Sequence, residues 1–172
     1  MPTPFTRILV PTDFSELSGV ALEFGQALAE RFGASLHVLH VVDDPFAAGP
    51  ISSEIYVADV PPLRGALVTE AETRLAGLLP ESVRAEVRLT SEVQVGSPAS
   101  TICEVAARTP CDLIVMGTHG RSGVAHLFLG SVAERVVRTA PCPVLTVRGH
   151  ARAREHVVEA VSQARPEPSA VE

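Results

Sequence analysis

The residues best suited to bind an anion lie in one stretch, Asp112 to Arg138. A short apolar run, Asp112 to Met116, precedes Gly117, and a Gly130-Ser131 pair opens a segment with helical periodicity. Glycines allow backbone N–H groups to approach a phosphate closely, and the first turn of a helix adds unpaired N–H donors and a partial positive charge. The stretch therefore predicts a buried strand, a glycine-bearing loop and a helix start that together form an anion site.

A second group of polar residues, Pro11-Thr12-Asp13, follows another apolar run, Arg7 to Val10. In open α/β sheets, ligands bind beyond the carboxyl ends of the strands, where the strand order reverses. If the two runs are neighbouring strands at that point, Asp13 faces the glycine loop. An aspartate there suits ribose hydroxyls or a Mg²⁺ ion beside phosphates. The alternative is that Asp13 only caps the helix that starts near Ser15.

Two common nucleotide-binding motifs are absent from the sequence. There is no G-x-x-x-x-G-K-[ST], so no P-loop lysine is available, and no G-x-G-x-x-G follows the first strand. The pattern that remains is G-x-x-G, nine residues, then G-S, formed by Gly117, Gly120, Gly130 and Ser131.

The elements that must position these residues alternate between strand and helix. Periodicity predicts strands at 7–10, 36–42, within 83–95, 112–116 and 143–147. It predicts helices from about 15 to 32 (ended by Gly33 as a left-handed cap), 63–79, 98–108 (capped by Ser97) and from 131 onward. Inward positions of the second helix are Leu63, Leu67, Ala71, Leu75 and Leu78, and residues 43–62 form a long loop. The alternation predicts an α/β fold, with a parallel sheet covered by helices on both faces.

Length and charge limit the function further. The chain of 172 residues suits one domain, residues 1–148, followed by a C-terminal extension, 149–172, with a short helix and then disorder. A net charge of −6 argues against nucleic acid or an acidic membrane as a partner. We expect a cytoplasmic protein, because no apolar run could span a membrane and no signal peptide is visible. Cys111 and Cys142 each precede an apolar run, either as buried structural thiols or as a redox pair.

Several motifs together resemble one family. The G-x-x-G-x₉-G-S pattern, the opening R-I-L-V-P-T-D-F-S, the L-H-V-V of the second strand and the closing P-C-P-V-L-T-V are similar to the nucleotide-binding branch of the universal stress protein family. The likeness covers about Thr6 to Arg148. It implies a five-stranded parallel sheet of order 3-2-1-4-5, Rossmann-like and similar to adenine nucleotide alpha hydrolases. It also implies ATP or a related adenine nucleotide as ligand, and a homodimer.

The same resemblance assigns site residues by position. Pro11, Thr12 and Asp13 would line the adenosine and ribose end, and the backbone of Val41 would meet the adenine. The rest would surround the ribose and phosphates: Met116, Gly117, His119, Gly120, Gly130, Ser131 and Val132. Arg121 is the cation of the loop, and the alternatives are that it reaches a terminal phosphate or that it is only solvated. Met116 suits the core equally well, and His119 suits water; His37 and His40, within a strand, are expected to be packed structural histidines.

The sequence favours a binding protein over an enzyme. Phosphoryl transfer needs a positioned base and charge neutralisation, and Asp13 is the one plausible Mg²⁺ ligand. We therefore expect a regulatory, stress-response protein whose bound state is read by a protein partner, with slow or no hydrolysis. The alternatives are a Mg²⁺-dependent ATPase or phosphotransferase that uses Asp13, and a nucleotide-free dimeric interaction module. The strand Val144 to Val147, a short apolar edge blunted only by Pro143, is the expected homodimer contact.

Overall fold

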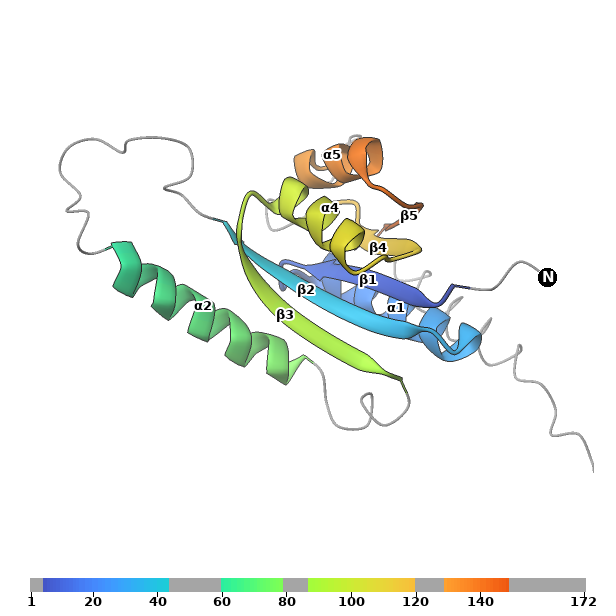
Figure 1. Cartoon of the computed structure of the whole chain (residues 1–172), viewed down its shortest axis with the longest axis horizontal. Helices are drawn as coiled ribbons and strands as arrows, with labels where there is room; N and C mark the ends of the chain where they lie inside the picture. Colours follow the sequence, from blue (N-terminus) through green and yellow to red (C-terminus); the bar gives the residue numbers. More distant parts are fainter. Residues whose placement is uncertain (1–4, 44–59, 79–86, 120–128, 149–172) are drawn as a thin grey trace, which may run out of the picture.

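The computed structural model describes residues 5–43, 60–78, 87–119 and 129–148. Five parallel strands form one sheet in the order β3-β2-β1-β4-β5, which confirms the predicted fold and strand order (Figure 1). The strands are β1 (Arg7–Thr12), β2 (Ser35–Asp43), β3 (Leu89–Gly96), β4 (Leu113–Gly117) and β5 (Val144–Val147). The helices are α1 (Glu16–Phe32), α2 (Val60–Gly77), α4 (Pro98–Arg108) and α5 (Ser131–Thr139).

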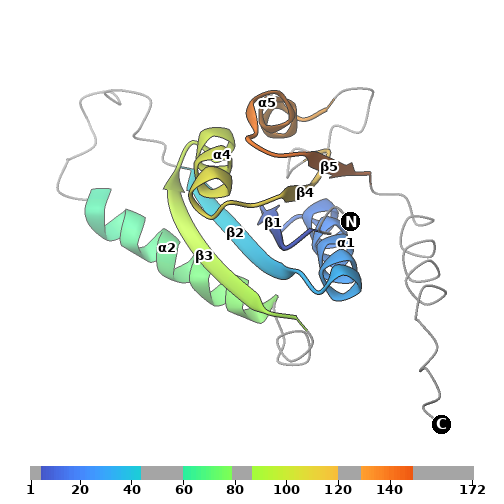
Figure 2. The same ribbon diagram turned by 45° about the vertical axis from the view of Figure 1, so that its right-hand side comes forward.

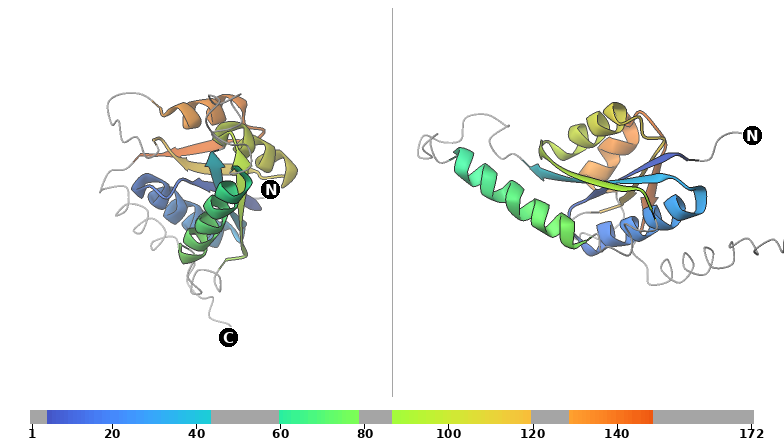
Figure 3. Two further views of the ribbon diagram at one scale, coloured as in Figure 1. Left: turned by 90° about the vertical axis from the view of Figure 1, so that its left-hand side faces the viewer. Right: turned by 60° about the horizontal axis from the view of Figure 1, so that its bottom comes forward.

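Helices cover both faces of the sheet, α1 and α2 on one side and α4 and α5 on the other (Figures 2 and 3). Successive strand residues therefore enter different cores. In β1, Ile8 and Val10 pack in the α1 core, whereas Leu9 packs in the α4 and α5 core. All three side chains are fully buried. This burial on both faces explains why the central strands read as continuous apolar runs.

Helix α1 begins and ends as the sequence predicts. The Ser15 side chain accepts a hydrogen bond from the Ser18 amide at the first turn. Gly33 follows the last turn with a φ of 65°, in the left-handed region that glycine adopts without strain. Ser97 occupies the cap position of α4 and Pro98 its first turn, but the Ser97 side chain makes no capping hydrogen bond.

The prediction for α2 is wrong in two respects. The helix starts at Val60 instead of Leu63, because Pro61 and Pro62 are tolerated in a first turn, where N–H groups have no helical partner. In addition, Leu63 is 52% exposed and Leu67 38% exposed. The first turns of α2 lie beyond the carboxyl end of β2, so no strand covers them (Figures 1 and 3). Ala71 and Leu75, farther along, are buried as predicted.

The strand boundaries also differ from the prediction. β1 and β2 extend to Thr12 and Asp43, so both strands run into the predicted loops. β3 lies at the edge of the sheet as expected but begins only at Leu89. β4 starts after Asp112 and includes Gly117. Helix α5 starts at Ser131 as predicted and is nine residues long.

The carboxylate of Asp112, the residue before β4, binds the start of β1. Its Oδ2 accepts hydrogen bonds from the Thr6 amide at 2.8 Å and the Thr6 hydroxyl at 2.7 Å, and its Oδ1 accepts one from the Arg7 amide at 3.2 Å. The side chain thus links the amino ends of β1 and β4. Burial raises its pKa, but these hydrogen bonds outweigh burial and hold the pKa below the ordinary aspartate value.

Several predictions concern residues that the structure does not describe. They are the roles of Gly120 and Arg121, the strand positions 83 and 85, most of the 43–62 loop, and the extension 149–172. Among the described residues, no helix is long and apolar enough to span a membrane. The three cysteines are free thiols, with Cys111 buried and Cys103 and Cys142 half-buried.

Candidate functional site

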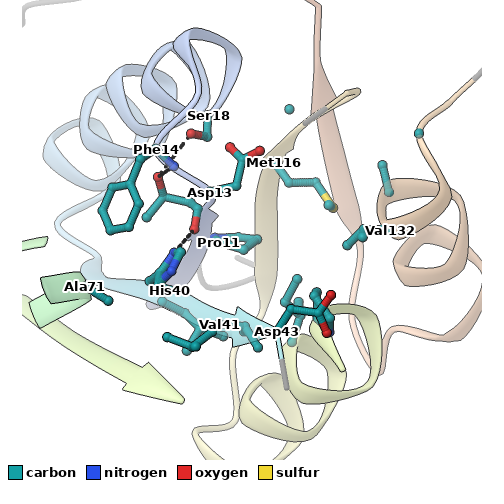
Figure 4. Close-up of a pocket in the computed structure, with 18 of the residues that line it drawn as sticks. Pro11, Asp13, Phe14, Ser18, His40, Val41, Asp43, Ala71, Met116 and Val132 are labelled. Carbon is teal, nitrogen blue, oxygen red and sulfur yellow. Dashed lines mark hydrogen bonds between the residues drawn. The ribbon is translucent and has the colours of Figure 1, made fainter. Parts of the chain in front are cut away.

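A cavity of about 590 Å³ opens at the carboxyl end of the sheet (Figure 4). It is lined by the ends of β1, β2 and β4 and by residues of α1, α2, α4 and α5. The adjacent strands β1 and β4 lie at the reversal of the strand order, since β2 and β3 continue on one side and β5 on the other. This is the place where open α/β sheets bind ligands.

The cavity brings together most of the residues that the sequence singles out. Ten of them line it: Pro11, Thr12, Asp13, Val41, Met116, Gly117, His119, Gly130, Ser131 and Val132. Gly120 and Arg121 lie outside the described residues. The structure therefore supports the grouping, while the contact of each residue with a ligand stays a prediction.

Asp13 forms a tight turn between β1 and α1. Its Oδ1 accepts hydrogen bonds from the Ser15 amide at 3.1 Å and the Ser15 hydroxyl at 2.6 Å. Because Ser15 itself caps the helix, the hypothesis that Asp13 is the helix cap is wrong. Asp13 instead orients the capping serine and places a half-buried carboxylate at the cavity wall.

The start of α5 is built differently from the start of α1. Gly130 is its N-cap, and no side chain caps the first turn. The Gly130 amide donates to the Thr118 carbonyl at 2.7 Å, so it is engaged within the protein. The first-turn amides that follow, from Ser131 and Val132, have no partner within a helix. Both residues line the cavity, so these amides and the helix dipole are suited to an anion.

Neither of the two described site glycines, Gly117 and Gly130, has a positive φ. Gly130 has a φ of −61°, and Gly117 is an ordinary strand residue. Gly117 is needed for a close approach instead: a Cβ there would lie 3.3 Å from the backbone carbon and oxygen of Leu17 in α1. Glycine thus brings β4 and the first turn of α1 together at the cavity.

His119 supplies a polar atom that has no partner in the described part of the protein. Its Nδ1 lies 3.1 Å from the Thr118 hydroxyl, whereas its Nε2 is buried and makes no hydrogen bond there. A buried polar atom without a partner loses the free energy of hydration. His119 lines the cavity, and a polar ligand that reached Nε2 would satisfy this atom.

The backbone of β2 provides a further open edge. Pairing between β1 and β2 ends at Thr12 and His40, and β2 continues to Asp43. The side of Val41 and Val42 that faces β1 is therefore not covered by that strand. Backbone polar groups in this position can recognise the edge of a flat heterocycle, and Leu39, Val41 and Met116 offer apolar contact.

The described lining contains three carboxylates and one arginine. The carboxylates are those of Asp13, Asp43 and Glu70, and the arginine is Arg74. In the described ranges, no group of three or more histidine, cysteine, aspartate or glutamate side chains could hold a metal ion. A ligand with hydroxyls near Asp13, a flat apolar group near Val41 and an anion at α5 matches this arrangement.

The sequence profile of the universal stress protein family matches residues 4–148. The chain belongs to this family. Universal stress protein MJ0531 of Methanocaldococcus jannaschii is 34% identical over 145 residues, which cover 84% of this chain and 82% of that protein.

Solved structures agree with the family and the fold. The structure of protein MJ0577, a universal stress protein of Methanocaldococcus jannaschii, has a TM-score of 0.74 and 29% identity, and covers 86% of this chain and 98% of that one. A universal stress protein solved in complex with cAMP has a TM-score of 0.54 and 24% identity, and covers 84% of this chain and 97% of that one. At that identity the second likeness concerns the fold alone.

Four lining residues carry contacts that sequence reasoning did not assign to the site. They are Phe14, Ser18, His40 and Arg74. The Ser18 hydroxyl lies 3.0 Å from that of Thr12 within the buried wall. His40 is the packed structural histidine that its strand position predicts: it is 4% exposed, and its Nδ1 lies 2.8 Å from the Thr12 carbonyl. The contacts of Phe14 with His40 and Arg74 could not be predicted from the sequence, because they join distant segments.

Proposed function

We propose that this universal stress protein binds ATP or a related adenine nucleotide in the cavity at the carboxyl end of the sheet. The supporting observation is the meeting, in one cavity of about 590 Å³, of the Asp13 carboxylate, the open β2 edge at Val41 and the α5 start at Ser131. These three features suit a ribose, a base and a phosphate in turn. The volume lies within the range of small-molecule sites, about 300–1,000 Å³.

In this arrangement the adenine meets the Val41 backbone and packs against Pro11 and Met116. Asp13 accepts hydrogen bonds from the ribose hydroxyls. The inner phosphates lie near Gly117 and His119, whose Nε2 gains a partner, and the outer phosphates meet the first turn of α5. A Mg²⁺ ion beside the phosphates would have Asp13 as its ligand from the protein.

We propose that hydrolysis is slow or does not occur. The whole chain contains no lysine, since all 14 of its basic residues are arginines. Rapid phosphoryl transfer needs cations on the transferring group and a positioned base for the attacking water. Backbone amides of α5 hold phosphate oxygens without supplying either. The protein then acts as a regulatory, stress-response protein, and a partner protein reads its bound state.

The binding proposal is tested by Gly130→Val and isothermal titration with ATP. With its φ of −61° and ψ of 152°, Gly130 has a backbone conformation that valine also adopts, so the variant is expected to fold. The new side chain would cover the first-turn amides of α5, and the affinity for ATP is expected to fall at least tenfold. Gly65→Val is the control, because a Cβ there meets no atom within 4 Å. Unchanged affinity in Gly130→Val would refute the proposal.

A second measurement identifies the ligand directly. Mass spectrometry of small molecules released from freshly purified protein is expected to show an adenine nucleotide. Protein that carries no nucleotide and shows no thermal shift with ATP would favour the nucleotide-free interaction module.

We also propose that the chain forms a homodimer through β5. The strand is the last in the sheet order, and Leu145 within it is 39% exposed. An exposed edge strand has unpaired backbone N–H and C=O groups, and a short apolar one is unfavourably exposed to water. Pairing with a second copy would bury its apolar side chains and satisfy these groups. A dimer in light scattering at micromolar concentration is the expected result, and a monomer would refute this part of the proposal.

A further inference from the structure

Phe14, directly after Asp13, has a backbone conformation that is unfavourable for its residue type. Its φ is 63°, and within the described residues it is the one non-glycine residue with a positive φ. A bulky side chain in this left-handed region costs free energy, so the surroundings must compensate for it. Such residues concentrate at ligand sites, and Phe14 lines the cavity.

Contacts from three different elements hold Phe14 in place. Its amide donates to the Thr12 hydroxyl at 3.1 Å. Its ring stacks on the His40 ring of β2, with centroids 4.3 Å apart and planes tilted by 35°. The guanidinium carbon of Arg74, on α2, lies over the same ring, 4.2 Å from its centroid. A cation over an aromatic face is attracted by the ring quadrupole.

His40 is itself fixed, so it is a firm base for the stack. It is 4% exposed, and its Nδ1 lies 2.8 Å from the carbonyl oxygen of Thr12. A carbonyl only accepts, so Nδ1 carries the proton and donates. The same histidine therefore holds the residue before Asp13 by a hydrogen bond and the residue after it by stacking.

The left-handed turn separates the directions of two neighbouring side chains. In Figure 4, Phe14 lies beside His40, whereas Asp13 lies on the side of Met116. The Asp13 carboxylate accepts hydrogen bonds from the amide and the hydroxyl of Ser15, which belongs to the same turn. The ring of Phe14 links this turn to β2 through His40 and to α2 through Arg74, beside the hydrogen bond between His40 and Thr12.

We propose that Phe14, His40 and Arg74, here called the Phe14 stack, form a positioning unit that holds the Asp13 carboxylate against the ribose hydroxyls of the bound nucleotide. This inference rests on the proposed function. It makes helix α2 part of the nucleotide site, because Arg74 lines the cavity, lies over the ring of Phe14 and positions Asp13 through that ring. The stack thereby sets the preference for a ribonucleotide over an analogue without the hydroxyls.

The test compares the affinities for ATP and for 2′,3′-dideoxy-ATP by isothermal titration. A hydrogen bond to a charged acceptor changes affinity by about tenfold or more, so the wild-type protein is expected to prefer ATP by at least about tenfold. In Phe14→Ala and in Arg74→Met, this preference is expected to fall to about one, with less than about a twofold change for the dideoxy analogue. Phe14→Tyr keeps the ring and is expected to retain the preference. Arg31→Met, an exposed arginine of α1 outside the cavity, is the control.

A double variant distinguishes an effect on the position of Asp13 from a general loss of structure at the cavity. If the Phe14 stack acts through Asp13, Phe14→Ala changes the preference no further once Asp13→Asn is present. An equal loss of affinity for both nucleotides in Arg74→Met, or an unchanged preference, would overturn the inference. If Phe14→Ala does not fold by circular dichroism, Arg74→Met decides.

The failure of this inference and that of the proposed function have different signatures. A wild-type protein that binds ATP and its dideoxy analogue equally well overturns the role of the Phe14 stack and leaves nucleotide binding intact. A wild-type protein that binds neither overturns the proposed function, and the inference with it.

Discussion

Replacing Asp112 with asparagine tests what holds β1 and β4 together at their amino ends, the ends that lie away from the cavity. The carboxylate accepts hydrogen bonds from Thr6 and Arg7, which begin β1, while Asp112 precedes β4. Hydrogen bonds to a charged group contribute about 1.5–3 kcal/mol when buried. Asp112 is half-buried, so solvent partly screens its charge, and we expect Asp112→Asn to lower the free energy of unfolding by about 1–2 kcal/mol near neutral pH.

The effect should depend on pH with a defined sign. The folded-state pKa of Asp112 lies below its ordinary value, because the hydrogen bonds from Thr6 and Arg7 outweigh burial. The stability from the carboxylate is therefore fully present above the unfolded pKa of about 4 and is lost as pH falls through the folded pKa. Once protonated, the wild-type side chain resembles asparagine, so the two proteins become alike.

Urea unfolding followed by circular dichroism, from about pH 7 down to about pH 3, measures this difference. Glu134→Gln is the matched control: its carboxylate pairs with Arg138 at 2.9 Å on the surface of α5, and the change should cost less than about 0.5 kcal/mol at any pH. A difference between wild type and Asp112→Asn that stays constant over this range would refute the reasoning. Since Asp112 lies far from the cavity, nucleotide affinity should not change.

Three further predictions concern packing, assembly and thiol reactivity. Gly25→Ala should destabilise the fold by about 1–2 kcal/mol in thermal unfolding, because the new Cβ would lie 2.5 Å from a side-chain carbon of Val10. Gly19→Ala should instead stabilise the fold by about 0.5–1 kcal/mol, because a Cβ there meets no atom within 4 Å and alanine favours a helix. Effects of the same sign in the two variants would contradict this reasoning. Leu145→Asp should convert the proposed dimer to a monomer in light scattering, and a persisting dimer would place the interface elsewhere. Burial raises the pKa of the Cys111 thiol, so alkylation should be slow in the native protein and rapid in denaturant. Rapid native labelling of this cysteine would argue against its burial.

Local patterns predicted the parts of the site that depend on strand ends and helix starts. Asp13 follows an apolar run and Ser131 opens a helical one, and both features are visible within a few residues. The resemblance supplied the strand order that makes β1 and β4 neighbours. The role of Gly117 was not predictable, because it depends on the approach of Leu17 from a different element.

Other features depend on contacts that periodicity does not contain. An apolar stripe on α2 predicts that Leu63 faces inward, but the stripe does not reveal that the helix runs past the sheet. The left-handed conformation of Phe14 is accompanied by its hydrogen bond to Thr12 and its contacts with His40 and Arg74, which come from other elements. No local rule favours phenylalanine there, since glycine or asparagine would adopt this conformation more easily.

Two helix starts of opposite character meet at the cavity. The first turn of α1 is capped by Ser15 and adjoins the Asp13 carboxylate, whereas the first turn of α5 follows Gly130, which has no side chain to cap it. An elongated ligand with hydroxyls at one end and phosphates at the other therefore fits in one orientation. Its phosphates would meet backbone dipoles, which attract a nucleoside triphosphate and its product alike. Interactions that do not strengthen in the transition state lower the free energy of binding without raising the rate, so under the proposed function this site would hold a nucleotide more than cleave it.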